Sequence, residues 1–273
     1  MVEYDIAPRR KFSFGVRELW QYRELFYFFT WRDIKVRYKQ ATFGVLWAVA
    51  QPLSMMVVFT VVFSRGLRVG SDGLPYPIFA FSGLMIWNIF SNGLLNAASS
   101  MVSNAHIIRK IYFPRLIIPM SAILTALFDF LFALVVFGGL IFYFKIPISV
   151  AKCLVSIPLS ILLTVLTAFG LGTLLASLNV KYRDFQYALP FLIQFLLFLN
   201  PVLYSTKTFD NPILRTLMTF NPIAGAIDLV RGCLTNEAVN WQVIGGQFLV
   251  AFGLLLVGVY FFRKMEAYFA DFA

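Results

Sequence analysis

The chain has 273 residues, of which 60% are hydrophobic and only 13% are charged. Soluble domains usually have about 25% charged residues, so this composition excludes an ordinary soluble domain and indicates a membrane protein. The formal net charge of +10 would suggest a nucleic-acid partner in a soluble protein. In a membrane protein, the distribution of basic residues over the loops indicates how the chain is oriented in the membrane. We therefore predict no nucleic-acid partner.

The first forty residues are charged and aromatic, and we predict that they form a cytoplasmic tail without a cleavable signal peptide. Within Val16–Thr30, the apolar residues Leu19, Tyr22 and Phe26 fall on one helical face, opposite a charged face. This pattern predicts an amphipathic helix that lies in the inner membrane interface, where such a helix also interacts with membrane lipids. The helix either anchors the protein or also shapes a transport path, and the sequence leaves both functions open.

Six stretches beyond the tail are long enough to cross a bilayer, which takes about 20 mostly apolar residues. They are free of charge except for Asp129 and lie at about residues 42–64, 77–101, 116–143, 153–177, 186–204 and 241–262. The sequence therefore predicts an all-α membrane protein in which residues 41–273 form one domain of six transmembrane helices. With the N-terminus in the cytoplasm, 16 of the 23 Lys and Arg residues lie on that side. The positive-inside rule then predicts that both termini are cytoplasmic.

Two segments between spans have a distinct pattern. Ser103–Arg115 mixes apolar and basic residues, and Pro114 stops any helix that forms there. This pattern favours a short amphipathic cytoplasmic helix of the size that fits a groove on a partner. The stretch Leu217–Ile227 is apolar but too short to span, and Asn221-Pro222 marks a turn within it. We predict that this stretch forms a re-entrant helical pair before the sixth span, at the mouth of a pore through the membrane.

Asp129 lies within the third span. A charge at the centre of a span costs roughly 2.5–3.5 kcal/mol on insertion scales, so this side chain is expected to face protein or water. It is either a proton or substrate site or a hydrogen-bonded packing residue, and the absence of an obvious intramembrane base favours packing.

Aromatic and amide side chains alternate along one face of two spans. Sugar rings present C–H faces and hydroxyls that suit such a surface, although packing against neighbouring helices is the commoner role of aromatic faces. The candidate residues for a glycan path are Phe43, Trp47 and Gln51 in the first span and Tyr187, Phe191, Gln194 and Phe198 in the fifth.

The chain lacks the residues of the common catalytic sites. It has no G-x-x-x-x-G-K-[ST] motif for ATP, and its single histidine excludes a histidine metal cluster. We therefore predict no catalytic residue, no metal site and no cofactor in this chain.

Several segments together resemble the transmembrane subunits of type-2 ABC exporters that move lipid-linked polysaccharides. They are R-D-I-K-V-R-Y-K-Q (32–40), G-L-M-I-W-N-I-F-S-N (83–92), I-R-K-I-Y-F-P-R-L-I-I-P (108–119), V-K-Y-R-D-F (180–185), L-N-P-V-L-Y-S (199–205) and N-P-I-A-G-A-I-D-L-V-R (221–231). The resemblance implies a homodimer in the bacterial inner membrane with two copies of a separate ATPase, which binds the ATP and Mg²⁺. It also implies a glycan cargo on undecaprenyl pyrophosphate.

The resemblance assigns roles to residues as well. The residues implied in coupling to the ATPase are His106, Ile107, Ile108, Arg109, Lys110, Ile111, Tyr112, Phe113, Lys181 and Arg183. The residues implied in attracting the pyrophosphate headgroup are Arg32, Lys35, Arg37 and Lys39. Two alternatives remain at this stage: a type-2 exporter of another cargo, such as a drug or a lipid, and a polyprenyl-linked membrane enzyme. A proton-coupled carrier is disfavoured by the scarcity of acidic residues within the spans.

Overall fold

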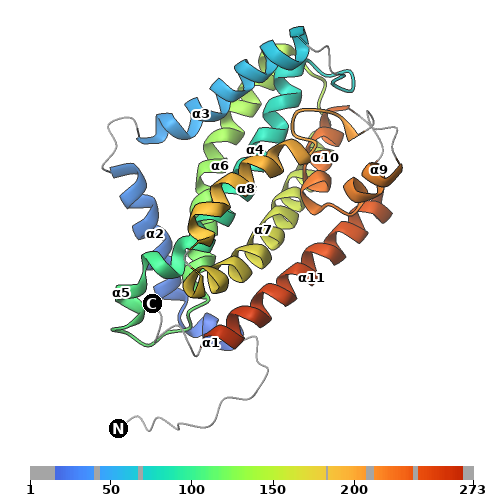
Figure 1. Cartoon of the computed structure of the whole chain (residues 1–273). Coiled ribbons are helices and arrows are strands. Elements are labelled where there is room, and N and C mark those ends of the chain that lie inside the picture. The colour runs from blue at the N-terminus through green and yellow to red at the C-terminus, as the bar shows by residue number, and fades with distance from the viewer. Residues whose placement is uncertain are drawn as a thin grey trace.

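The computed structural model describes residues 16–39, 44–66, 70–182, 184–206, 212–235 and 239–266. Over these ranges the chain forms helices and loops and no strand, which confirms the predicted all-α class. The long helices form a bundle with α1 and α5 at one end and α9 and α10 towards the other (Figure 1).

Within the described ranges, five helices are long and apolar enough to cross a membrane. The first is the stretch Leu46–Ser64, which belongs to α3 (Gly44–Phe59) and the π-helical turn η1 (Thr60–Gly66) that follows it. The other four are α4 (Tyr76–Ser103), α6 (Ile117–Phe144), α7 (Val150–Lys181) and α11 (Trp241–Met265). All five overlap predicted spans, so the chain is a multi-pass membrane protein.

The predicted span at residues 186–204 is not a helix of spanning length. Helix α8 (Phe185–Leu199) has 15 residues, which is about 22 Å at 1.5 Å per residue and less than the ~30 Å hydrocarbon core. The chain leaves the helix at Asn200 because Pro201 has no backbone N–H and because Arg231 binds the backbone carbonyls of Pro201 and Val202. The sequence pattern alone shows neither that arginine nor its partners.

Helix α4 is the centre of the bundle and packs against α6 and α7, while α11 packs on the other side of α7. Its spanning window is 83% buried, against 11% for the first span. Small residues let α7 approach α4 closely, since a methyl group added at Gly172 of α7 would lie 2.8 Å from the Cβ atom of Ala97 on α4. The first span therefore leaves most of its surface uncovered within a single chain.

The N-terminal helix is longer than predicted. A one-residue break at Tyr22 separates α1 (Val16–Gln21) from α2 (Arg23–Lys39), so the helix continues well past the predicted end at Thr30. Helix α2 packs against α6, and Phe29 and Ile34 are its buried residues. Burial against α6, together with α2's lack of helix breakers, explains why the basic segment after Thr30 stays helical.

Two shorter helices flank the predicted turn at Asn221-Pro222, namely α9 (Pro212–Thr219) and α10 (Pro222–Thr235). The Asn221 side chain caps α10 by accepting a hydrogen bond from the backbone N–H of Ile223 at 3.0 Å. Most residues of α10 are buried, because it packs against α7, α4 and α11.

Candidate functional site

The segment after α4 presents apolar and basic side chains at one end of the bundle. It contains the single helical turn α5 (Ala105–Ile108), shorter than predicted, and then an irregular stretch to Arg115. Ile111 and Tyr112 are 59% and 71% exposed. Exposed apolar side chains of this size mark a surface that another protein can cover.

The predicted coupling residues divide into two groups. Ile108 and Phe113 are buried in a cluster with Phe29 and Ile117, so they anchor the segment to the bundle. The residues exposed at the surface of the segment are His106, Arg109, Lys110, Ile111 and Tyr112, and Ile107 is half-buried.

The second predicted contact lies at the same end of the bundle (Figure 1). Lys181 is the last residue of α7, is exposed, and has its Nζ atom 5.1 Å from the centroid of the Tyr182 ring. Arg183 lies outside the described residues.

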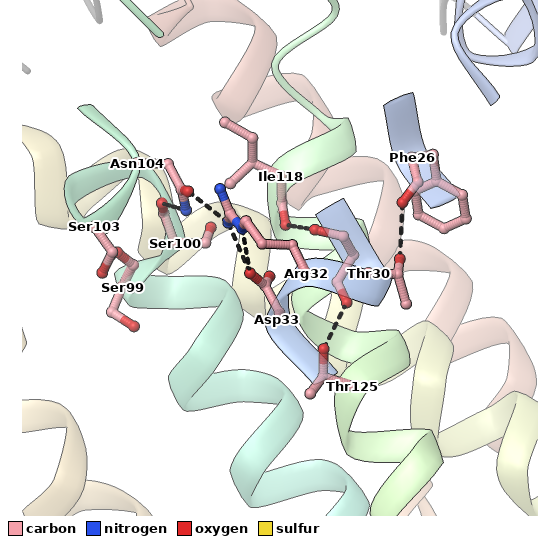
Figure 2. Close-up of polar contacts among 11 residues, drawn as sticks. Phe26, Thr30, Arg32, Asp33, Ser99, Ser100, Ser103, Asn104, Ile118 and Thr125 are labelled. Atoms are coloured by element: carbon pink, nitrogen blue, oxygen red, sulfur yellow. Dashed lines mark hydrogen bonds and ion pairs between the residues drawn. The ribbon is translucent and has the colours of Figure 1, made fainter. Parts of the chain in front are cut away.

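Helix α2 is tied to this segment by two contacts. The rings of Phe29 and Phe113 lie with their centroids 5.6 Å apart. The Arg32 guanidinium donates to Oδ1 of Asn104 at 2.8 Å and also forms an ion pair with Asp33, as Figure 2 shows. Asn104 in turn donates to the backbone oxygen of Ser100 on α4 at 2.9 Å. The segment after α4 and helix α2 are therefore in direct contact at two points.

A polar cavity of about 220 Å³ lies among α2, α3, α4 and α6. Its polar lining residues are Arg37, Tyr38, Gln51, Asn88, Asn92 and Asp129. Trp47 and Phe130 contribute aromatic rings to the remaining, mostly apolar lining. Polar groups that converge beside apolar side chains in one cavity are typical of a binding site, and we call this cavity the polar pocket.

Asp129 connects α6 to the far end of α2. Arg37 donates from Nη1 to Oδ2 of Asp129, and the Tyr38 hydroxyl donates to Oδ1. These contacts offset the cost of an acidic residue within a span. Burial, and then the hydrogen bond to Asp129, raise the pKa of Tyr38 above its usual value, so its hydroxyl stays protonated and able to donate.

The structure brings together only some of the predicted path and headgroup residues. Trp47, Gln51 and Arg37 line the polar pocket, whereas Arg32 lies at the junction with Asn104. Lys35 and Lys39 are exposed on α2. The four path residues predicted on α8 are all exposed and none lines the pocket; they are Tyr187, Phe191, Gln194 and Phe198. Phe43 lies outside the described residues.

Sequence reasoning missed Tyr38, Asn88 and Asn92. The two asparagines stand four residues apart in α4, which has no charged residue, and therefore share one face. A pair of amides at that spacing within a predicted span is a signal that points to a polar contact.

A fourth residue without a predicted role is Arg231, at the other end of the bundle. It is 5% exposed and donates to the backbone oxygens of Pro201 at 2.7 Å, Val202 at 2.8 Å and Phe79 at 3.1 Å. Its guanidinium carbon lies 3.5 Å from the centroid of the Phe79 ring. Arg231 thus holds the irregular segment after α8 against α4 and α10.

Comparison with known proteins gives a consistent result. A family model described as ABC-2 type transporter matches residues 24–235. The chain is 30% identical to the O-antigen export system permease protein RfbA of Klebsiella pneumoniae over 88% of its length and 91% of the relative's. It is 32% identical to a protein of the same name from Myxococcus xanthus, over 76% of this chain and 79% of the relative. It is 20% identical to the polysialic acid transport protein KpsM of Escherichia coli, over 86% of this chain and 91% of the relative.

Proposed function

The chain belongs to the ABC-2 type transporter family, and from that premise we propose that it is the permease subunit of an ATP-driven polysaccharide exporter. The observation that carries this proposal is the similarity to O-antigen export permeases along 91% and 79% of their lengths. The cargo in this proposal is a glycan linked to undecaprenyl pyrophosphate, and the membrane is the bacterial inner membrane.

The partner is a separate ATPase, since family members transport with such a subunit and do no catalysis themselves. In this proposal ATP and Mg²⁺ bind to that subunit, and this chain holds no cofactor. The exposed Ile111 and Tyr112, with Lys181 at the same end of the bundle, are the surface on which the ATPase docks. Buried Ile108 and Phe113 then pass its movement to α2 and to the start of α6.

The permease acts as a homodimer with the ATPase in two copies. Uncovered surface on the first span and on α8 supports this: α8 buries only one stripe, formed by Leu189, Ile193 and Leu197. Exposed rings such as Trp47 and Tyr187 lie on these two elements. In the dimer they face the path, and a sugar polymer slides along rings that offer weak, repeated contacts.

The finer topology is also proposed here. Both termini are cytoplasmic, and α8 with the irregular segment to Thr206 makes the fifth of six crossings. Helices α9 and α10 form the re-entrant pair. The buried Arg231 supports this arrangement, since irregular backbone at membrane depth requires protein partners for its carbonyl groups.

Co-expression with the ATPase encoded beside it tests the function. A complex of two permeases and two ATPases that hydrolyses ATP, together with loss of surface polysaccharide in a deletion strain, is the expected result. The proposal is contradicted if the chain purifies without an ATPase. It is also contradicted if the deletion strain carries a normal amount of surface polysaccharide.

A further inference from the structure

We propose that the polar pocket binds the phosphoryl group of the cargo. In the absence of cargo Arg37 is paired with Asp129, and the phosphoryl group takes the place of the Asp129 carboxylate on Arg37. The inference rests on the proposed function and adds two points to it: where the headgroup binds, and which carboxylate it displaces. Arg37 and Asp129 both line the pocket and are paired with each other.

Arg37 is the basic residue of α2 that the structure places in the pocket. Arg32 is engaged with Asp33 and Asn104 at the other end of the helix. The Nζ atom of Lys35 lies 5.4 Å from the centroid of the Trp31 ring, outside the pocket lining. A guanidinium also suits a phosphoryl group better than an ammonium, because it presents paired N–H donors to two oxygens at once.

The remaining lining complements a phosphate that carries a sugar. Asn88 and Asn92 of α4 and Gln51 of α3 supply amide donors and acceptors, and Trp47 supplies a ring. The cavity of about 220 Å³ exceeds the ~30 Å³ share of one water several times over. A phosphoryl group with its adjoining sugar atoms therefore has both room and hydrogen-bonding partners there.

Asp129 is suited to pair with Arg37 while no cargo is bound. Its carboxylate accepts from Arg37 at Oδ2 and from Tyr38 at Oδ1. When a phosphoryl group takes the guanidinium, Tyr38 still donates to Asp129, so the carboxylate keeps a partner. The pyrophosphate carries more charge than the carboxylate and binds arginine bidentately, which favours the exchange.

The exchange also has a mechanical consequence. The contact between Arg37 and Asp129 helps to hold the C-terminal end of α2 on α6, whereas Arg32 and Phe29 tie its other part to the segment that follows α4. Release of Arg37 leaves Tyr38 as the side chain that holds this end of α2 on Asp129. This end is then held less tightly, while the other end remains tied to the proposed ATPase surface. Cargo binding in the pocket is thereby communicated to that surface through a single helix.

Binding to the permease–ATPase complex in nanodiscs tests the proposal, with undecaprenyl pyrophosphate as the probe and native mass spectrometry as the readout. Arg37→Gln is expected to weaken binding about tenfold or more, because a charge-assisted contact is lost. Asp129→Asn is expected to tighten it about tenfold, because no carboxylate must be displaced. Arg23→Gln removes the same charge from the other end of α2 and should change nothing.

Each contrary result overturns a named part of the proposal. Unchanged affinity in Arg37→Gln overturns the site, and unchanged or weaker affinity in folded Asp129→Asn overturns the exchange. Two further arms use inorganic pyrophosphate and nanodiscs enriched in phosphatidylglycerol. If inorganic pyrophosphate binds as tightly as undecaprenyl pyrophosphate, the pocket is a site for free phosphate. If phosphatidylglycerol binds as tightly, the pocket is a site for ordinary lipid. Either result overturns the assignment to the cargo.

A second measurement leaves both paired residues intact. Spin labels at Val36 and Leu131, which are 60% and 55% exposed on α2 and α6, are introduced in a background where Cys153 and Cys233 are replaced by alanine. Undecaprenyl pyrophosphate is expected to lengthen the distance between the labels, and an unchanged distance overturns the loosening of this end of α2. If the ATPase does not co-purify with the wild type, the proposed function fails; if it does and the probe does not bind, only the pocket assignment fails.

Discussion

Gly170 of α7 and Gly258 of α11 face each other so closely that a methyl group at Gly258 would lie 1.9 Å from the carbonyl oxygen of Gly170. A methyl group at Gly170 would likewise lie 2.6 Å from the backbone of Leu254. Lipid is as apolar as the helix surfaces, so close backbone packing of this kind, and not burial from water, holds α11 on α7.

The first prediction concerns this crossing. Gly258→Ala is expected to lower the free energy of unfolding in detergent by about 1–3 kcal/mol, because the added methyl group forces the two helices apart. The control is Gly253→Ala on the same helix, where no atom lies within 4 Å of the added methyl group. Equal stability of the two variants would contradict close packing at the crossing.

The second prediction concerns Arg231. Arg231→Met leaves the backbone oxygens of Pro201, Val202 and Phe79 without their donor and should lower the free energy of unfolding by at least about 2 kcal/mol. Arg215→Met makes the same change at an exposed position of α9 and should be neutral. Thermal unfolding and protease cleavage after α8 measure the effect, and a variant as stable and as protease-resistant as the control refutes the role.

The third prediction tests the docking surface. Ile111→Asp puts a charge on a side chain that is 59% exposed at the proposed ATPase contact, and we expect at least about tenfold weaker co-purification of the ATPase. Ile148→Asp is the matched change at an exposed isoleucine between α6 and α7, at the opposite end of the bundle. Equal recovery of ATPase with both variants would remove Ile111 from the contact.

The fourth prediction concerns the junction between α2 and α4. A double-mutant cycle with Arg32→Ala and Asn104→Ala should give a coupling energy of about 0.5–3 kcal/mol in unfolding, because the two side chains are hydrogen-bonded. Asn104→Ala should also reduce the stimulation of ATP hydrolysis by cargo while the ATPase still co-purifies. The control cycle pairs Asn104→Ala with Arg23→Ala, and additive behaviour in both cycles argues against the junction.

The fifth prediction concerns the exposed rings. Trp47→Ala combined with Tyr187→Ala should slow export of long polysaccharide chains more than short ones, because a longer polymer makes more contacts along the path. The control combines Phe142→Ala and Tyr143→Ala, which remove two exposed rings from α6. The length distribution of surface polysaccharide is measured on gels. An unchanged distribution would show that these rings do not contact the polymer and serve only in packing or lipid contact.

Much of the fold was predictable from the sequence because hydropathy acts locally along a chain. Stretches without charge, apart from the single Asp129, located the five helices of spanning length found in the described residues, and Asn221-Pro222 located the turn between α9 and α10. The sequence did not predict the length of α2, since the basic residues after Thr30 do not show that α6 lies beside them. It also overestimated α8, because the partner that ends this helix, Arg231, is 30 residues further along the chain.

The candidate site shows the same division. The sequence by itself determined that Asp129 must face protein or water, since an unpaired charge is costly within a span. Only the tertiary structure decided that its partners are Arg37 and Tyr38, more than 90 residues earlier in the chain, and that Asn88 and Asn92 join them around one cavity. Composition and periodicity report the environment each residue requires, whereas hydrogen bonds and close backbone contacts depend on which helix faces meet when the bundle packs.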